Sequence, residues 1–146
     1  RESTDLGYGF LDQPKELTGV LSVAMFNRNP KVNDSPLDSP NEPAEYLSQI
    51  RAKFEAAVLA ATEELQAEII VMPDIGCGVF MNDPLIIGGC LGSVLRRYRS
   101  RLTSLKKVVL CSGRASFSES CQRALEGQDP RPRCRDGAAC SSRSDP

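Results

Sequence analysis

The chain has 146 residues, 40% of them apolar and 25% charged, and this length suits one domain with a sizeable core. It contains no histidine, which excludes histidine-based catalytic triads, histidine-ligated metals and imidazole acid–base chemistry. The net charge of −1 is unevenly placed, because residues 1–74 hold 6 Lys/Arg and 13 Asp/Glu whereas residues 75–146 hold 12 and 6. The basic half suits an anionic ligand or an acidic partner, although solvated faces that happen to segregate give the same pattern.

The first predicted elements are an arm, a strand and a long loop. Residues 1–17 are polar and are expected to form an extended arm, which Tyr8, Phe10 and Leu11 could anchor on a neighbour. Thr18 to Phe26 is predicted to be a strand. The loop at 30–43 follows with four prolines, and loops of this length in compact domains are usually functional or disordered.

A long helix is predicted from Glu42 to Gln66, with Asn41 as N-cap and Pro43 in the first turn. Its apolar residues recur at helical spacing and form one stripe: Leu47, Ile50, Phe54, Ala57, Val58, Ala61 and Leu65. Glu63 and Glu64 are neighbours in this helix and therefore do not face each other, so we do not expect a catalytic carboxylate pair.

A strand, a glycine loop and a helix start come next. The apolar run Ile69–Met72 predicts a central parallel strand buried on both faces. Gly76 and Gly78 allow positive φ angles and uncovered N–H groups. Asp83 is the expected N-cap of the next helix, with Pro84 at its first position. Such a loop is a natural cradle for phosphate, and an ordinary tight turn between strand and helix is the alternative.

The helix expected from Pro84 to about Arg101 contains three glycines, which we interpret as packing positions against the sheet: Gly88, Gly89 and Gly92. Its last turns carry a cluster of arginines: Arg96, Arg97, Arg99 and Arg101. These cations suit the helix dipole, and nucleic-acid binding is the less favoured alternative because few aromatic residues are interleaved with them.

The last elements are a strand, a short helix and a tail. Lys107 to Cys111 is predicted to be a buried strand. Ser116 and Glu119 fit a capping box that opens a helix from Phe117 to Glu126, and Gly127 ends it. Residues 127–146 are rich in arginine, proline and serine without any period, and we expect a polar tail without fixed structure unless a partner orders it.

The six cysteines show no C-x-x-C spacing, so no zinc site is expected. Cys77, Cys90 and Cys111 fall where an α/β protein commonly buries free thiols, while Cys134 and Cys140 in the tail could pair with each other. This usage favours an intracellular, reducing compartment, with an organelle reached by a cleaved transit peptide as an alternative. No run approaches the length of a transmembrane helix.

The run Gly76-Cys77-Gly78-Val79-Phe80-Met81-Asn82-Asp83-Pro84 resembles the second phosphate loop of macro domains, most closely that of microbial-type poly(ADP-ribose) glycohydrolases. The resemblance spans about residues 18–126. It departs from the family at Met81, where the family has glycine, and at Phe26, where it has proline. It implies a three-layer α/β fold, a parallel or mixed sheet flanked by helices, of which this chain holds the C-terminal part.

The resemblance also implies a ligand site. Gly76, Cys77, Gly78, Val79 and Phe80 would hold the diphosphate of ADP-ribose, with Phe80 packed against a ribose. Asn27 would lie near the ligand, although capping a turn is an equally good reading of this residue. The family's catalytic segment, a glycine run followed by Gln-Glu-Glu, is absent from the sequence, so no catalytic residue, metal or cofactor is predicted.

Three functions fit these observations. The chain is a non-catalytic accessory or structural subunit of a larger protein assembly with a relic or working loop, or an ADP-ribose-binding module, or a glycohydrolase whose N-terminal half is not in this sequence. Since the chain starts at Arg1, it is expected to be a processed protein, an excised piece or part of a longer chain. A partial sheet should expose a strand edge, so protein partners are expected to cover it and to contact the arm and tail.

Overall fold

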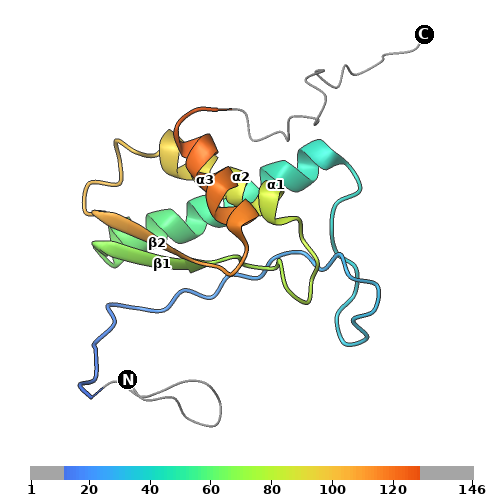
Figure 1. The fold of residues 1–146 in the computed structure, drawn as a ribbon, viewed down its shortest axis with the longest axis horizontal. Coiled ribbons are helices and arrows are strands. Elements are labelled where there is room, and N and C mark those ends of the chain that lie inside the picture. Colours follow the sequence, from blue (N-terminus) through green and yellow to red (C-terminus); the bar gives the residue numbers. More distant parts are fainter. Residues whose placement is uncertain (1–11, 129–146) are drawn as a thin grey trace.

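The computed structural model describes residues 12–128, and within this range three helices stand beside a two-stranded parallel sheet (Figure 1). The helices are α1 (Pro43–Leu59), α2 (Pro84–Arg97) and α3 (Ala115–Leu125), and a π-helical turn at Ala60–Glu64 extends α1. The strands are β1 (Ile69–Pro73) and β2 (Lys107–Cys111). The predicted α/β character and parallel pairing are therefore confirmed.

Strands β1 and β2 pair in the register Ile69–Lys107, Val71–Val109 and Pro73–Cys111. All three helices lie on one side of this sheet, with α2 packed between α1 and α3. The inner side meets the core through Met72, whereas Ile69 and Val71 are exposed on the other side. The prediction of a central strand buried on both faces is therefore wrong. In the described residues, β1 lies in a sheet of only two strands with one open face.

The segment predicted as a first strand, Thr18–Phe26, runs extended beside β1 but forms no ladder with it (Figure 1). At the amino end of this segment, the side chain of Leu65 lies against Gly19. The segment is therefore met there by a side chain and not by the backbone of a strand. At its carboxyl end Met25 and Phe26 are buried in the core. The strand prediction is thus wrong in its pairing, although the extended path is present.

The helix boundaries differ in small ways from those predicted. Helix α1 starts at Pro43 behind Glu42, and neither Glu42 nor the predicted Asn41 caps it with a side chain. The Thr62 hydroxyl donates to the Val58 carbonyl oxygen at 2.8 Å, and this side-chain bond competes with the helical pattern where the π turn forms. Helix α2 ends at Arg97, and residues 98–101 form turns instead of the predicted last helical turn.

The predicted capping box of α3 is absent. The helix already begins at Ala115, so Ser116 lies inside its first turn and cannot act as the N-cap. The side chain that orders this start is Ser112, whose hydroxyl accepts from the Arg114 N–H at 2.9 Å. Gly127 ends the helix with φ +85°, as predicted.

The packing glycines of α2 contact a different element from the one predicted. A Cβ atom at Gly88 would lie 2.2 Å from the Phe117 carbonyl oxygen, and one at Gly92 would lie 2.1 Å from that of Cys121. Both contacts are with the backbone of α3, not with the sheet. Small residues four apart on one helix face let two helix backbones touch, and the Ser120 hydroxyl bonds the Leu85 carbonyl oxygen at the same crossing.

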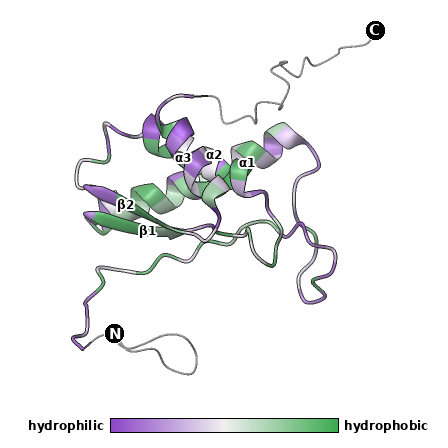
Figure 2. Ribbon diagram, viewed as in Figure 1, coloured by the Kyte–Doolittle hydropathy of each residue, from purple (hydrophilic) through white to green (hydrophobic). Residues whose placement is uncertain are grey.

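The core fills the space between the helices and the inner side of the sheet. Its most deeply buried large side chains come from all three helices: Ile50, Phe54, Ile87, Leu91 and Phe117. Figure 2 shows both strands and the middle of the helix layer as hydrophobic ribbon. Within residues 12–128 no helix has the length and apolarity needed to cross a bilayer, and no cluster of three metal-binding side chains occurs.

Candidate functional site: the glycine loop

The glycine loop (residues 74–83) leaves the carboxyl end of β1 and ends at the N-terminus of α2 (Figure 1). Arg114 reaches the same edge from the connection between β2 and α3 and forms an ion pair with Asp74. Ligands of open parallel sheets bind beyond the carboxyl ends of the strands, so the loop occupies the expected edge. The Asp83 carboxylate accepts from the Leu85 N–H at 2.8 Å, which confirms the predicted cap of α2.

The loop turns back on itself through short-range backbone bonds. The Cys77 N–H donates to the Asp74 carbonyl oxygen, and the Met81 N–H donates to that of Gly78, both at 3.1 Å. Gly76 takes φ +77°, as its sequence position predicts, whereas Gly78 does not use a positive angle. The N–H groups of Gly78, Val79 and Phe80 donate to no acceptor in the described residues. Three successive backbone donors therefore remain free for an anion.

Asn82 holds the loop in place, and its role was not predicted from the sequence. Its amide nitrogen donates to the Phe26 carbonyl oxygen at 2.8 Å and to that of Gly76 at 2.9 Å. Its amide oxygen accepts from the Tyr46 hydroxyl at 2.6 Å. One buried side chain thus joins α1, the extended segment and the loop. The only sequence signal was its place before Asp83 in the loop motif.

Asn27 has its polar atoms engaged within the proline-rich loop. Its amide nitrogen donates to the carbonyl oxygens of Ser35 at 2.8 Å and Pro36 at 3.3 Å, and its amide oxygen accepts from the Asn29 N–H. Its backbone N–H donates to the Asp38 carboxylate at 2.6 Å. This geometry favours turn capping, the alternative interpretation of Asn27, over direct contact with a ligand.

The backbone following Asn27 nevertheless touches the glycine loop. The Arg28 N–H donates to the Phe80 carbonyl oxygen at 3.0 Å, and the Asn29 side chain donates to that of Val79 at 2.8 Å. The carbonyl oxygens of Val79 and Phe80 are therefore both engaged by the segment that follows Asn27. The Val79 side chain is exposed and Phe80 is half-buried. The backbone after Asn27 therefore lies against Val79 and Phe80, and ligand contact by these residues stays a prediction.

Cys77 is buried and acts as a packing thiol. Burial raises its pKa to about 11, with a further contribution from the charge of Asp74. Burial also raises the pKa values of Cys90 and Cys121 to about 11. Cys77 and Cys90 are free and buried, as predicted, and Cys121 is a third buried free thiol. Cys111 is also free but is exposed on the open side of the sheet, so its predicted burial is wrong. Cys134 and Cys140 lie outside the described residues.

An aromatic and cationic cluster adjoins the loop, to which it is bonded by the Tyr46 hydroxyl and the Arg28 N–H. The Arg28 guanidinium carbon lies 4.8 Å from the centre of the Tyr46 ring, and the Lys53 Nζ lies 4.7 Å from that of Phe26. The two rings are 5.9 Å apart. Burial raises the pKa of Tyr46, against the influence of Arg28, so the hydroxyl stays protonated and donates to Asn82. Arg28 belongs both to this cluster and, through its backbone N–H, to the contact with the Phe80 carbonyl oxygen.

Asp74 and Arg114 form a second charged feature at this edge. Partial burial alone would raise the pKa of Asp74, but hydrogen bonds from Arg114 and Ser112 outweigh it and lower the pKa. The carboxylate is therefore ionised and compensated. It is held by Arg114 and Ser112 and is not left as an unpaired carboxylate beside the loop.

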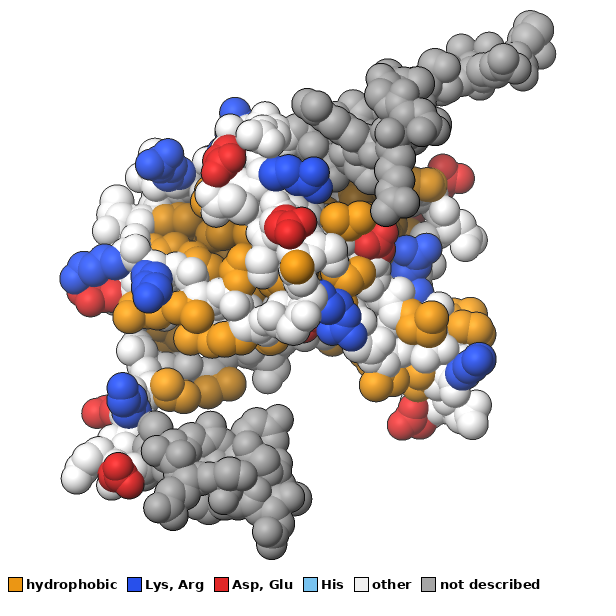
Figure 3. Space-filling model, in the orientation of Figure 1, with side chains coloured by type: hydrophobic (Ala, Val, Ile, Leu, Met, Phe, Trp, Pro, Cys, Tyr) orange, Lys and Arg blue, Asp and Glu red, His pale blue; other side chains and the backbone are white. Residues whose placement is uncertain are grey.

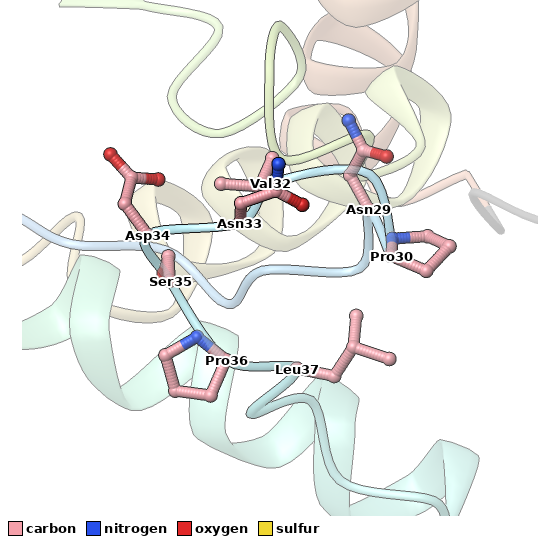
Figure 4. Close-up of a pocket in the computed structure, with 8 residues that line it drawn as sticks. All are labelled: Asn29, Pro30, Val32, Asn33, Asp34, Ser35, Pro36 and Leu37. Carbon is pink, nitrogen blue, oxygen red and sulfur yellow. The ribbon is translucent and has the colours of Figure 1, made fainter.

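A hollow of about 420 Å³ lies within the proline-rich loop, next to the glycine loop, to which Asn29 connects it. Figure 4 shows that all the residues around it come from this single loop: Asn29, Pro30, Val32, Asn33, Asp34, Ser35, Pro36 and Leu37. It does not include any residue of the predicted diphosphate loop. The hollow thus belongs to the irregular connection before α1.

The carboxylates of Glu63 and Glu64 lie away from this edge. Glu63 follows α1 and forms an ion pair at 2.7 Å with Arg101, which precedes β2 at the amino end of the sheet. That this pair is not catalytic stays a prediction. Comparisons of the chain with protein-family models, with curated proteins and with solved structures found no match.

Proposed function

We propose that this chain is a non-catalytic, macro-domain-like accessory module of a larger protein assembly. The observation that carries the proposal is the half-finished sheet. In the described residues the outer edge of β2 pairs with nothing, and the face opposite the helices is open. An unpaired strand presents rows of N–H and C=O groups that favour pairing with another chain, so a partner strand is expected along β2.

Cross-linking of the assembly purified from its source cells tests this proposal. Lys106 and Lys107 stand at the start of β2 and are exposed, so amine-reactive linkers should join them to a stoichiometric partner. Lys53, which stacks on Phe26 on the helix side, is the internal control and should yield fewer links to that partner. A chain that runs alone in sedimentation, or a partner linked only through the helices, would contradict the proposal.

ADP-ribose binding at the glycine loop is the second candidate function. It is favoured by the free N–H groups of Gly78, Val79 and Phe80 and by the resemblance of the loop to a macro-domain phosphate loop. The helix start behind the loop and the nearby cation Arg28 add favourable charge for a diphosphate.

Calorimetry with ADP-ribose tests this second candidate. Val79→Glu places a negative charge on an exposed side chain of the loop, and we expect it to weaken binding at least about tenfold, roughly 1.4 kcal/mol. Val20→Glu introduces the same charge at an equally exposed site at the amino end of the molecule and should leave the affinity unchanged. Absence of heat with the unaltered chain, or equal losses in both variants, would refute loop binding.

Hydrolysis of ADP-ribose polymers is not expected. The carboxylates near the loop are committed, since Asp74 pairs with Arg114 and Asp83 caps α2. Incubation of the chain with labelled polymer should release no ADP-ribose. Release that disappears when one of these two carboxylates is replaced by its amide would show that the chain is a glycohydrolase.

A further inference from the structure

The proline-rich loop contains a short tandem repeat that the candidate site does not use. The triplet Asp-Ser-Pro occurs at residues 34–36 and again at 38–40, and Leu37 joins the two copies. Nowhere else in the sequence does a serine or threonine precede a proline. Both copies lie in one connection without helix or strand, which projects from the lower right of the molecule (Figure 3). The repeat therefore places two serine hydroxyls on a protruding loop.

A proline that follows a serine makes that serine a distinctive substrate. The ring of Pro36 disfavours a helical conformation of Ser35 and keeps it extended. Proline also lacks an N–H, so an enzyme cannot accept a backbone hydrogen bond there and must accommodate the ring instead. Protein kinases bind the acceptor segment in an extended form, and one class of them selects a serine by the proline after it. Each Asp-Ser-Pro triplet has the chemistry of a substrate for this class.

The surroundings of Ser35 suit such an enzyme. Within the described residues the Ser35 hydroxyl forms no hydrogen bond, and no backbone N–H from residue 33 to 37 donates one. The neighbours Asp34, Pro36 and Leu37 are all exposed, and Ser35 itself is half-buried at a bend (Figure 4). A kinase can therefore engage this stretch without breaking a helix or a strand ladder.

Ser39 belongs to the same triplet but is held more firmly. The Asp38 carboxylate before it accepts from the Asn27 N–H at 2.6 Å, a charge-assisted bond. The Ser39 hydroxyl donates to the Pro40 carbonyl oxygen at 3.4 Å, and Pro40 is half-buried. An enzyme that must close around the ring meets an exposed proline after Ser35 and a partly covered one after Ser39. The fold thus distinguishes two serines that their triplets make alike.

Asn27 connects Ser35 to the glycine loop. Its amide nitrogen donates to the Ser35 carbonyl oxygen at 2.8 Å, and the two residues that follow Asn27 bond the carbonyl oxygens of Phe80 and Val79. Phosphoserine carries about −1.5 to −2 charges at neutral pH. A phosphate on Ser35 would therefore add negative charge to the segment that holds the glycine loop.

We propose that Ser35 is a phosphorylation site for a proline-directed protein kinase, and that this kinase prefers it to Ser39. In the transfer, the Ser35 Oγ attacks the γ-phosphorus of ATP, and the new Oγ–P bond forms as the bond from phosphorus to the ADP oxygen breaks. The hydroxyl proton passes to the catalytic base of the kinase, and ADP leaves. This chain supplies the hydroxyl and the exposed proline ring.

Incubation of the folded 146-residue chain with a cyclin-dependent kinase and ATP tests the proposal. Trypsin cleaves after Lys31 and Arg51, so Ser35 and Ser39 lie on one peptide, whose fragment ions locate the phosphate. We expect Ser35 to gain phosphate about tenfold faster than Ser39, the factor that corresponds to the charged hydrogen bond of Asp38. Ser35→Ala should remove most of the incorporation, whereas Ser39→Ala, the matched control, should leave it nearly unchanged.

A synthetic peptide of residues 31–42 gives the two rates without the fold, and it should show a smaller difference between the serines. Equal rates in the folded chain, or incorporation only in the peptide, would overturn the proposal. Mass spectrometry of the chain purified from its source cells with phosphatase inhibitors completes the test. Phosphate on Ser35 supports the proposal, and phosphate confined to Ser39 or absent from both serines would contradict it.

Discussion

At the residue scale, Met81 occupies a backbone conformation that suits glycine. Its φ angle is +55°, a left-handed region that costs most side chains about 1–2 kcal/mol. Its side chain is exposed and contributes little packing. The loop therefore keeps its shape at a local cost in free energy.

We expect Met81→Gly to stabilise the chain. Relief of the left-handed strain outweighs the extra freedom that glycine gives the unfolded chain, leaving a gain of up to about 1 kcal/mol in the free energy of unfolding. Denaturant titration measures it. Met81→Ala is the control and should bring no comparable gain, because alanine keeps the Cβ atom. A loss of stability in the glycine variant would show that the Met81 side chain supports the loop.

The hydrogen bond between Tyr46 and Asn82 joins two residues that are 36 positions apart. Tyr46→Phe removes only the hydroxyl and leaves the Asn82 amide oxygen unsatisfied, which should cost about 1–2 kcal/mol of unfolding free energy. Asn82→Ala also frees the carbonyl oxygens of Phe26 and Gly76 and should cost about 3 kcal/mol. Equal costs for the two variants in denaturant titrations would contradict the role of Asn82 as the central acceptor and donor.

At the element scale, the crossing of α2 and α3 depends on the absence of two Cβ atoms. Gly88→Ala and Gly92→Ala should each destabilise the chain by about 3 kcal/mol, because the added atom meets carbonyl oxygens of α3 that cannot rotate away. The gain in helix propensity, about 1 kcal/mol, is smaller. Gly78→Ala, with open space at the Cβ position, is the control and should be nearly neutral. Thermal unfolding measures the stability of the three variants. Equal midpoints for Gly78→Ala and the two helix variants would contradict this packing.

The ion pair between Asp74 and Arg114 joins the glycine loop to the connection between β2 and α3. Since the pKa of Asp74 is lower in the folded chain than its ordinary value of about 3.9, the pair adds stability above that pH and loses it as the pH falls through the folded pKa. We expect Asp74→Asn to lower the unfolding free energy at pH 6, by no more than about 1 kcal/mol because Arg114 is nearly half exposed, and to have a smaller effect at pH 2.

The control for this pH series is Glu68→Gln. Glu68 pairs with Lys106, but both side chains are mostly exposed, so its removal should change stability little at either pH. An effect of Asp74→Asn that grows towards acid would show the opposite linkage and would contradict the ion pair as its cause.

The helices and the parallel strands could be predicted because their signals are local. The apolar spacing of α1, the Asp83 cap and the β-branched run of β1 each lie within a few residues. The pairing of Thr18–Phe26 could not be predicted, because an apolar alternating run shows that a segment can be extended and not whether a neighbour bonds it. The start of α3 was missed because Ser112, outside the helix, orders it.

The candidate site was predictable only in part, for the same reason. Gly76 and Asp83 have roles that their own backbone positions require. The roles of Asn82 and Tyr46 come from contacts across the fold, and no spacing in the sequence indicates them. Asn27 was placed near the loop by resemblance, but its side chain serves the proline-rich loop. Ligand binding by Gly76–Phe80 stays a prediction.

At the scale of the whole molecule, the chain combines a compact helix layer with a sheet that is open at one edge and on one face. The helices contact one another through α2, whereas the segment at 12–26 is held mainly at its end, through Met25 and Phe26. A molecule built this way should unfold unevenly, with the segment opening before the helices.

Hydrogen exchange can resolve this difference. In the described structure no N–H group from Thr18 to Phe26 donates a hydrogen bond, so these amides should exchange much faster than those of α2, which serve as the internal standard. Bonding of this segment into the sheet within an assembly should protect them strongly. Slow exchange from residue 18 to 26 in a monomer would show a third ladder strand already formed, and the sheet would then be more nearly complete than the accessory role requires.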